Sequence, residues 1–377
     1  MKRVALVAVL VLALACVAAP YVSAAALLAD LSGTHPGWRQ WLPVRVHQVS
    51  WRDVDVPTRS GPVPARLYEP EGTSRGLWIV VPGLHAGGVD EPRLVRLTTR
   101  LAAEGLTVLS LPLPDLRAFH IVTRSTDQIE DAVLWATGND GVGRAAPVTL
   151  AGISFGGGLA LAAAGRPAIT NRLHRAVSFG GHGLLPRAID YVCTGLLPDG
   201  TPQPPHDYGI AILLLQGIPY LVPPDQAQPL DEAVRTYLDA SMANGIDQPR
   251  ADVLFARAAT LSAQLTEPAR AIMQEVNARD VRALGARLLP LAEVVGGAPA
   301  LSPERSPVPT APVFLIHGAH DTVIPQTEST LLADFYRSRG GSVEVLLTPA
   351  ISHADPSAHT TFKDVWDLIR MWVQISA

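Results

Sequence analysis

The sequence predicts an α/β protein whose central, mostly parallel sheet is covered by helices on both faces. Three short runs, at 76–82, 147–152 and 311–318, are rich in apolar residues and carry no Lys, Arg, Asp or Glu, which is typical of strands buried on both faces. Segments with helical spacing alternate with these runs, and such alternation implies parallel strands joined by helical crossovers. Hydrophobic residues make up 48% of the 377 positions, so the chain can bury a sizeable core.

The elements of the first half follow in order. Residues 49–57 and 63–70 flank the segment TRSGP and predict a β-hairpin. Apolar residues at helical spacing, followed by a glycine, predict a helix over 91–105. Ser125 and Gln128 predict a capping box at the start of the next helix. The other expected elements here are strands at 76–82, 106–114, 147–152 and 175–181, a helix at 125–137 and an Ala/Leu-rich helix that ends at 165.

The alternation then stops and resumes only near residue 311. The intervening block is mostly helical and rich in proline, with an apolar run at 210–224 and a helical period at 231–245. We expect it to be an insertion at the carboxyl edge of the sheet, where open α/β sheets bind ligands. The resumed elements are a strand at 311–318, a helix at 327–341, a strand at 342–349 and a closing helix at 361–374.

The N-terminus predicts a targeting segment. Lys2 and Arg3 precede residues 4–29, which contain no charge. A cleaved secretory signal ending near Ala24 and an uncleaved membrane anchor both fit this pattern. In either case the basic end stays in the cytoplasm and the body lies outside the inner membrane, in the cell envelope or secreted. The predicted division is a signal or anchor at 1–29, a linker at 30–48, a core at 49–183 and 310–377, and a helical cap insertion at 184–309.

The net charge, the cysteine count and the absence of several motifs argue against several classes of protein. A formal net charge of -4 gives no reason to expect nucleic-acid binding. Cys193 is the only cysteine outside the targeting segment, so a processed chain forms no internal disulfide. The sequence contains no H-E-x-x-H or Cys/His pairing, no P-loop and no G-x-G-x-x-G fingerprint. We therefore expect neither a metal nor a cofactor.

The segment GISFG at 152–156 matches G-x-S-x-G. The motif alone is weak, because Gly and Ser are common in turns. Here it follows a strand and opens an Ala/Leu-rich helix, which is the setting of a nucleophilic serine on a sharp strand-to-helix turn. Small flanking residues relieve the crowding at such a turn, and the helix N-terminus favours developing negative charge. Ser154 is therefore the candidate nucleophile.

A serine nucleophile needs a base and an acid that orients the base. Asp321 follows the strand at 311–318, and His353 follows the strand at 342–349. These strands are consecutive and the order Ser, acid, His fits this architecture, so we expect the two side chains to lie together. The weaker candidates are His317, His320 and His359 for the base and Asp355 for the acid.

Oxyanion donors are expected from two places. The N–H of Phe155 directly follows the serine, and the glycine-rich loop PGLHAGG at 82–88 offers Leu84 as first choice and His85 as second. His182, after the strand at 175–181, is expected to line the pocket together with His85.

GISFG, GAHDTVIP, ISHADP and PGLHAGG together resemble the α/β-hydrolase superfamily over roughly residues 50–183 and 310–377. The resemblance implies the α/β-hydrolase fold, a triad of Ser154, Asp321 and His353, and an acyl-enzyme mechanism. The chain departs from the family in its oxyanion loop, where Pro82-Gly83 replaces the usual His-Gly pair, and in its long insertion, which resembles a lid or cap.

The function expected from these residues is hydrolysis of a carboxylic ester or similar acyl bond, on a small-molecule substrate. The apolar insertion favours a lipophilic acyl or alcohol group. Prolyl-peptidase-like or acyltransferase activity would use the same triad. A membrane-tethered, non-catalytic binding protein on a hydrolase scaffold is the alternative from another class.

Overall fold

The computed structural model describes residues 2–33, 46–139, 141–143, 146–244, 246–351 and 360–376. Side chains are described from residue 17 onward. His353, Asp355 and His359 therefore lie outside the described residues, as does most of the expected linker at 30–48.

The centre of the molecule is an eight-stranded sheet with the order β1-β2-β4-β3-β5-β6-β7-β8. β1 pairs with β2 and β2 with β4 in antiparallel fashion, and every other neighbouring pair is parallel. This confirms the mostly parallel α/β sheet and the hairpin at its edge. The strands are β1 (Val49–Val56), β2 (Val63–Pro70), β3 (Leu77–Val81), β4 (Thr107–Ser110), β5 (Val148–Ile153), β6 (Arg175–Phe179), β7 (Val313–Gly318) and β8 (Val343–Thr348).

Helices cover both faces of the sheet because successive side chains of a strand point to opposite sides. Trp78 and Val80 of β3 face a cluster that contains residues of α1, α2 and α14, whereas Ile79 faces a cluster with α4, α5 and α13. Every residue of β3 is buried, as its uninterrupted apolar run predicts. These helices are α1 (Lys2–Leu31), α2 (Pro92–Ala103), α4 (Arg124–Ala136), α5 (Phe155–Ala164), α13 (Thr327–Ser338) and α14 (Phe362–Ser376), and the short α3 spans Pro114–Arg117.

The capping box predicted at Ser125 is wrong. α4 begins at Arg124, with Thr123 as its N-cap and no side-chain capping bond. The Gln128 side chain, which would complete a capping box, instead donates to Ser60 Oγ at 3.1 Å. Ser125 lies buried in the first helical turn.

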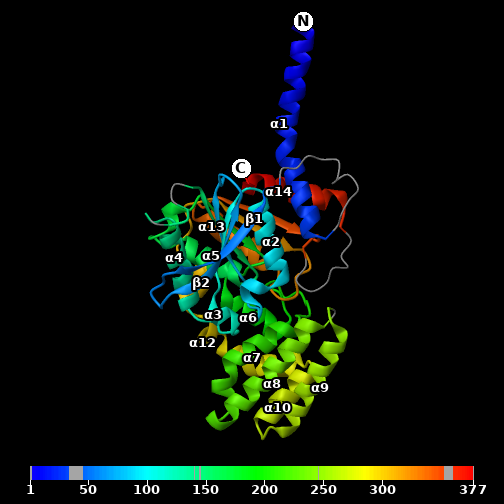
Figure 1. The fold of residues 1–377 in the computed structure, drawn as a ribbon. Coiled ribbons are helices and arrows are strands. Elements are labelled where there is room, and N and C mark those ends of the chain that lie inside the picture. The colour runs from blue at the N-terminus through cyan, green and yellow to red at the C-terminus, as the bar shows by residue number, and fades with distance from the viewer. Residues whose placement is uncertain are drawn as a thin grey trace.

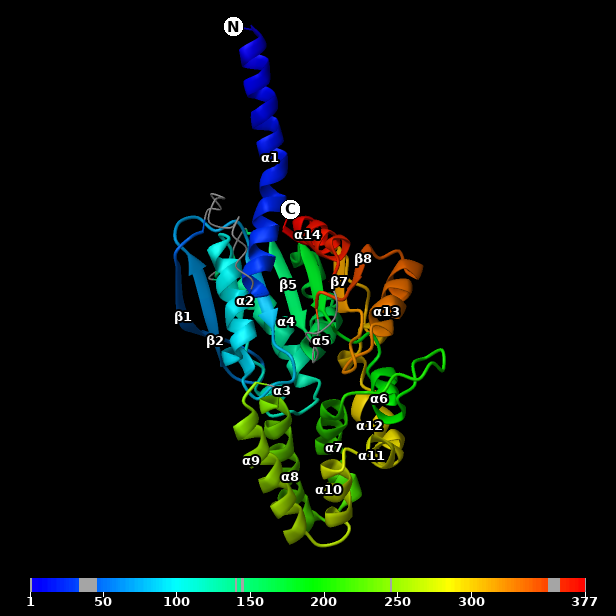
Figure 2. The ribbon, with the colours of Figure 1, turned by 90° about the vertical axis from the view of Figure 1, so that its right-hand side faces the viewer.

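A series of helices separates β6 from β7, and we call residues 185–305 the helical insertion. Figures 1 and 2 show it as a layer at one end of the sheet, on the opposite side of the molecule from the free end of α1. Its helices are α6 (Leu185–Thr194), α7 (Asp207–Leu221), α8 (Pro224–Ala243), α9 (Gln248–Gln264), α10 (Ala269–Asn277), α11 (Val281–Leu288) and α12 (Ala292–Gly296), followed by the 3-10 turns η5 (Pro299–Leu301) and η6 (Pro303–Arg305).

The second half of α1 packs against the body of the molecule. Tyr21 stacks on Trp366 of α14 with ring centroids 5.5 Å apart. Ala24 and Leu27 are 3% and 1% exposed, and Asp30 forms an ion pair of 2.7 Å with Arg100 of α2. This part of α1 therefore completes one face of the core. Within the described residues, no helix combines the length and the apolar character needed to cross a bilayer.

Candidate active site

Ser154 occupies the sharp turn between β5 and α5. Its backbone has φ 53° and ψ -132°, a positive-φ conformation outside the regions that residues with a Cβ normally adopt, so its surroundings must enforce it. The Ser154 N–H donates to the Phe179 carbonyl of β6 at 2.6 Å, and the Ser154 carbonyl accepts from the Gly157 N–H at 2.8 Å. The turn is thus fixed from the sheet on one side and from the helix on the other.

The glycines around Ser154 are required by close contacts. A Cβ on Gly152 would collide with the Gly156 carbonyl, and one on Gly156 would collide with the Pro82 carbonyl. A Cβ on Gly157 would meet the Ser178 side chain, and one on Gly158 the ring of His182. The first two glycines make the turn possible, and the other two let α5 begin close to β6 and the segment that follows it.

The loop after β3 passes directly over the candidate nucleophile. A Cβ placed on Gly83 would lie 3.1 Å from Ser154 Cβ and 3.6 Å from Ser154 Oγ. Leu84 follows, and its carbonyl accepts a hydrogen bond of 3.0 Å from the Tyr208 hydroxyl of α7. The N–H of Phe155 belongs to the first residue of α5, where the helix supplies no carbonyl partner. The two sequence-predicted oxyanion donors therefore flank Ser154 from different elements.

Asp321 lies in the turn that follows β7 and is 3% exposed. Its Oδ1 accepts from the N–H groups of Val323 at 2.8 Å and Ile324 at 3.0 Å. His317 Nε2 lies 3.5 Å from Oδ2 and donates to the Ile324 carbonyl at 2.9 Å. These contacts hold the carboxylate at the carboxyl end of the sheet, the end that also carries Ser154.

His353 itself lies outside the described residues, but the chain leading to it is described up to Ile351. β7 and β8 pair in parallel as far as Gly318 and Thr348. The Ile351 carbonyl lies so close to Gly318 that a Cβ there would contact it at 2.6 Å. The chain two residues before His353 is therefore next to the turn that holds Asp321.

A pocket of ≈ 600 Å³, counting the part open to solvent, lies next to Ser154. Its walls come from α6, α7, the oxyanion loop and the turn after β7. Ser154, His182 and Tyr208 are the polar side chains among the described residues that line it. The apolar lining consists of Leu84, Ile121, Phe155, Leu185, Ala188, Ile189, Val192, Gly209, Ile212, Leu213, Val323 and Ile324.

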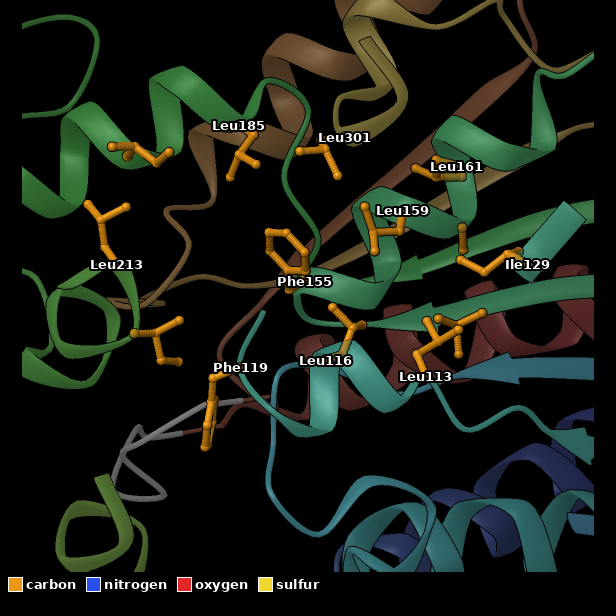
Figure 3. Packing of buried hydrophobic residues seen from close by; sticks show 14 of the residues in the cluster. Leu113, Leu116, Phe119, Ile129, Phe155, Leu159, Leu161, Leu185, Leu213 and Leu301 are labelled. Carbon is orange, nitrogen blue, oxygen red and sulfur yellow. The ribbon is translucent and has the colours of Figure 1, made fainter. Parts of the chain in front are cut away.

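His182 lines this pocket and is fully buried. Burial lowers its pKa, so the ring is neutral, and its Nε2 lies 2.8 Å from the Leu301 carbonyl, to which it donates. The ring stacks on Phe155 with centroids 4.8 Å apart. Figure 3 shows Phe155 at the start of α5, in the cluster that also contains Leu185 and Leu301. His182 therefore fixes the side chain of the residue that supplies one candidate oxyanion donor.

Two further histidine candidates, His85 and His317, have other partners in the structure. His85 is not among the residues that line the pocket, and its Nδ1 accepts from the Gly87 N–H at 3.0 Å. His317 is buried and hydrogen-bonded through both ring nitrogens, with Nδ1 2.7 Å from Ser329 Oγ. In the described part of the chain, no group of three or more His, Cys, Asp or Glu side chains could hold a metal ion.

Sequence reasoning did not identify the pocket residues of the insertion. Tyr208 and Gly209 lie at the start of α7, and Ala188 and Val192 lie on α6. All four lie in the helical insertion, whose sequence predicts helices but does not show which other elements those helices pack against. The apolar run at 210–224 was the only local signal, and it begins next to these α7 residues.

The eight-stranded topology, the serine turn and the acid after β7 together define the α/β-hydrolase fold. No family model and no curated protein sequence matches the chain. Among solved structures it is similar to an esterase from Pyrobaculum calidifontis, with 16% identity, coverage of 94% of this chain and 91% of that one, and a TM-score of 0.49. It is also similar to a bacterial heroin esterase, with 14% identity, coverage of 86% and 84%, and a TM-score of 0.47.

A third similar structure is a putative dienelactone hydrolase from Klebsiella pneumoniae, with 15% identity, coverage of 87% of this chain and 99% of that one, and a TM-score of 0.43. The fold assignment rests on the topology of this chain's own sheet and on the turn at Ser154.

The strained backbone of Ser154 leads to a prediction about stability. Ser154→Gly should be more stable than Ser154→Ala by about 1–2 kcal/mol, because glycine adopts this φ without strain and alanine does not. Both variants remove the hydroxyl, so neither keeps an activity that depends on it. Urea unfolding of the two variants measures the difference, and equal free energies of unfolding would show that the turn is not strained.

Proposed function

We propose that the protein is a serine hydrolase that cleaves a carboxylic ester through an acyl-enzyme on Ser154. The observation that carries the proposal is the strained Ser154 turn opening directly onto an apolar pocket. A strained backbone at a pocket is a feature of functional sites, where the surrounding structure enforces a conformation that is unfavourable on its own. A structural turn would gain nothing from such strain.

In the proposed mechanism the Ser154 hydroxyl attacks the ester carbonyl while His353 takes its proton. Asp321 orients the imidazole and stabilises the cation that forms. The N–H groups of Leu84 and Phe155 stabilise the negative charge on the carbonyl oxygen. His353 then protonates the leaving alcohol, and a water molecule activated by the same base releases the acid and restores Ser154.

The pocket supports an apolar substrate group. Its lining is apolar apart from three residues, and burying each methylene of a substrate there contributes about 0.8 kcal/mol. We propose that the acyl chain or the alcohol of the ester occupies it, and that the helical insertion acts as a cap that sets the size of this group. Tyr208 supports this role, because it both lines the pocket and bonds to the Leu84 carbonyl of the oxyanion loop.

A fluorophosphonate probe tests the nucleophile. The wild-type protein should be labelled at Ser154, and Ser154→Ala should be neither labelled nor active on p-nitrophenyl esters. Ser262→Ala, which removes another buried hydroxyl within α9, should be labelled normally. Mass spectrometry of the labelled peptide identifies the site. A wild-type protein that takes no label and hydrolyses no ester would instead be a binding protein on a hydrolase scaffold.

Pocket size is tested by enlarging Ala188, which is buried and lines the pocket from α6. Ala188→Leu should lower kcat/KM for long esters at least tenfold relative to short ones, because its three added carbons take the space of about three substrate methylenes, each of which contributes about 0.8 kcal/mol. Two ester series should be measured: p-nitrophenyl esters of acids of increasing length, and acetates of alcohols of increasing length. The series that changes identifies the substrate group in the pocket.

The matched control is Ala259→Leu, which adds the same side chain at an exposed position of α9. It should leave both ester series unchanged. If Ala188→Leu also left both series unchanged, the pocket would not be the binding site for the apolar group.

We further propose that the mature protein keeps α1 and uses it to associate with the membrane, with the body outside the cytoplasm. The contacts of Tyr21 and Ala24 support retention, because cleavage after Ala24 would remove the stacking on Trp366 and expose an apolar part of the core. The basic residues Lys2 and Arg3 support the orientation.

The intact mass of the exported protein tests whether the mature chain keeps α1. The expected mass includes residues before Ala25, and the protein is expected in the membrane fraction. A mature chain that begins at Ala25 and is found free in the envelope fluid would show that the segment is a removed signal.

A further inference from the structure

The turn at residues 319–324, which carries Asp321 and which we call the acid turn, is held by contacts with the insertion as well as by contacts within itself. Inside the turn, Oδ1 accepts the N–H groups of Val323 and Ile324. On the outer side, the carbonyl oxygens of Asp321 and Thr322 accept hydrogen bonds from the insertion. The backbone that directly follows the Asp321 side chain is therefore held by an element that lies more than a hundred residues away in the sequence.

Two side chains and one backbone group of the insertion make these outer contacts. The Gln203 amide donates from Nε2 to the Asp321 carbonyl at 2.8 Å and to the Tyr191 hydroxyl at 3.1 Å. The Tyr191 hydroxyl in turn donates to the Thr322 carbonyl at 3.3 Å. The His206 N–H donates to the same carbonyl at 2.8 Å. We call Tyr191, Gln203 and the His206 N–H the acid-turn clamp.

The clamp is itself held in place. Tyr191 lies on α6 and is 1% exposed, and burial raises the pKa of its phenol to about 12, so the hydroxyl keeps the proton that it donates. The Gln203 N–H donates to the Gly195 carbonyl at 2.8 Å, which closes the loop after α6. Tyr191 and Gln203 therefore donate to the acid turn from positions that are themselves fixed, the first by burial and the second by a backbone hydrogen bond.

The same elements form the wall of the pocket. α6, which carries Tyr191, contributes Ala188 and Val192 to the lining, and the acid turn contributes Val323 and Ile324. A movement of α6 relative to the sheet would therefore change the pocket and the position of the Asp321 backbone together.

We propose that Gln203 and Tyr191 are positioning residues of the triad, through which the helical insertion fixes the orientation of Asp321. The role rests on the proposed function, because it presumes that Asp321 orients the base. Neither residue touches the reacting atoms. Their effect on the rate passes through the backbone of the acid turn, whose displacement would misalign the carboxylate with the imidazole that it orients.

Gln203→Met tests the role, because methionine keeps the length of the side chain and removes both donor contacts. We expect kcat on a short p-nitrophenyl ester to fall about tenfold with KM unchanged, since misplaced catalytic groups slow the chemical step rather than binding. Tyr191→Phe, which removes one hydroxyl and keeps the ring, should act in the same direction and more weakly.

The pH profile separates positioning from loss of stability. A carboxylate that is well aligned with the imidazole stabilises its cation and raises the pKa of the base. Misalignment lowers that pKa, so the acidic limb of kcat/KM in Gln203→Met should move to lower pH while the maximum falls. If Gln203 only stabilised the fold, the acidic limb of kcat/KM would lie at the same pH in Gln203→Met as in the wild type.

Gln226→Met is the matched control. Gln226 is a half-buried glutamine of the insertion that donates to the Glu267 carbonyl at 2.9 Å and accepts from the Ala269 N–H at 3.2 Å. It does not line the pocket, so its loss should change neither kcat nor the pH profile.

The outcomes distinguish this role from the proposed function. One result would overturn the positioning role and leave the proposed function intact. In it, the wild type hydrolyses esters and is labelled at Ser154, while Gln203→Met keeps kcat within twofold of the wild-type value and shows the same acidic limb of kcat/KM. If Gln203→Met does not fold, Tyr191→Phe gives the same two readouts. A wild-type chain with neither hydrolysis nor labelling would remove the proposed function and this role with it.

Discussion

The site depends on one backbone constraint, the strained positive-φ conformation of Ser154 between β5 and α5. Two glycines without room for a Cβ and the hydrogen bond from Ser154 to β6 enforce it. The constraint places the hydroxyl at the carboxyl end of the sheet and places the first N–H groups of α5 beside it. Gly83 lets the oxyanion loop pass close to the serine, because a Cβ at this position would lie 3.1 Å from Ser154 Cβ. Without this turn, the Ser154 hydroxyl would not lie at the pocket.

The helical insertion contributes contacts and pocket walls to the candidate site that the sheet does not provide. Tyr208 bonds to the oxyanion loop, α6 and α7 wall the pocket, and Gln203 holds the acid turn. The buried Glu328 on α13 ties the start of the insertion to the core, because it accepts the N–H groups of Gly183 and Leu184 and pairs with Arg187 of α6. The insertion is thus attached to the core at the points where it also shapes the candidate site.

The sequence predicted those parts of the molecule that local patterns determine. The buried strands, the hairpin, the serine turn and the position of Asp321 after a strand depend on neighbouring residues, and the structure places them as expected. The capping box at Ser125 failed because α4 begins one residue earlier and Gln128 bonds to Ser60, which is distant in the sequence. Such a contact leaves no trace in the spacing of residues.

Long-range packing explains what else the sequence could not show. An apolar helix with Ala24 and Leu27 has the same pattern whether it faces lipid or packs on α2 and α14. Gln203 stands in a proline-rich stretch, where nothing nearby indicates that its partner is the carbonyl of Asp321. The candidate base, His353, lies outside the described residues, so its role remains a prediction from its place after β8.

The central claim is that the strained turn makes Ser154 a nucleophile whose oxyanion donors and pocket are already in place. A crystal structure of the protein after reaction with a long-chain alkyl fluorophosphonate tests it most directly. The account predicts phosphorus bonded to Ser154 Oγ, a phosphonyl oxygen within about 3 Å of the Leu84 and Phe155 nitrogens, and the alkyl chain between α6 and α7. An adduct on another residue, or a phosphonyl oxygen that points into solvent away from both N–H groups, would contradict it.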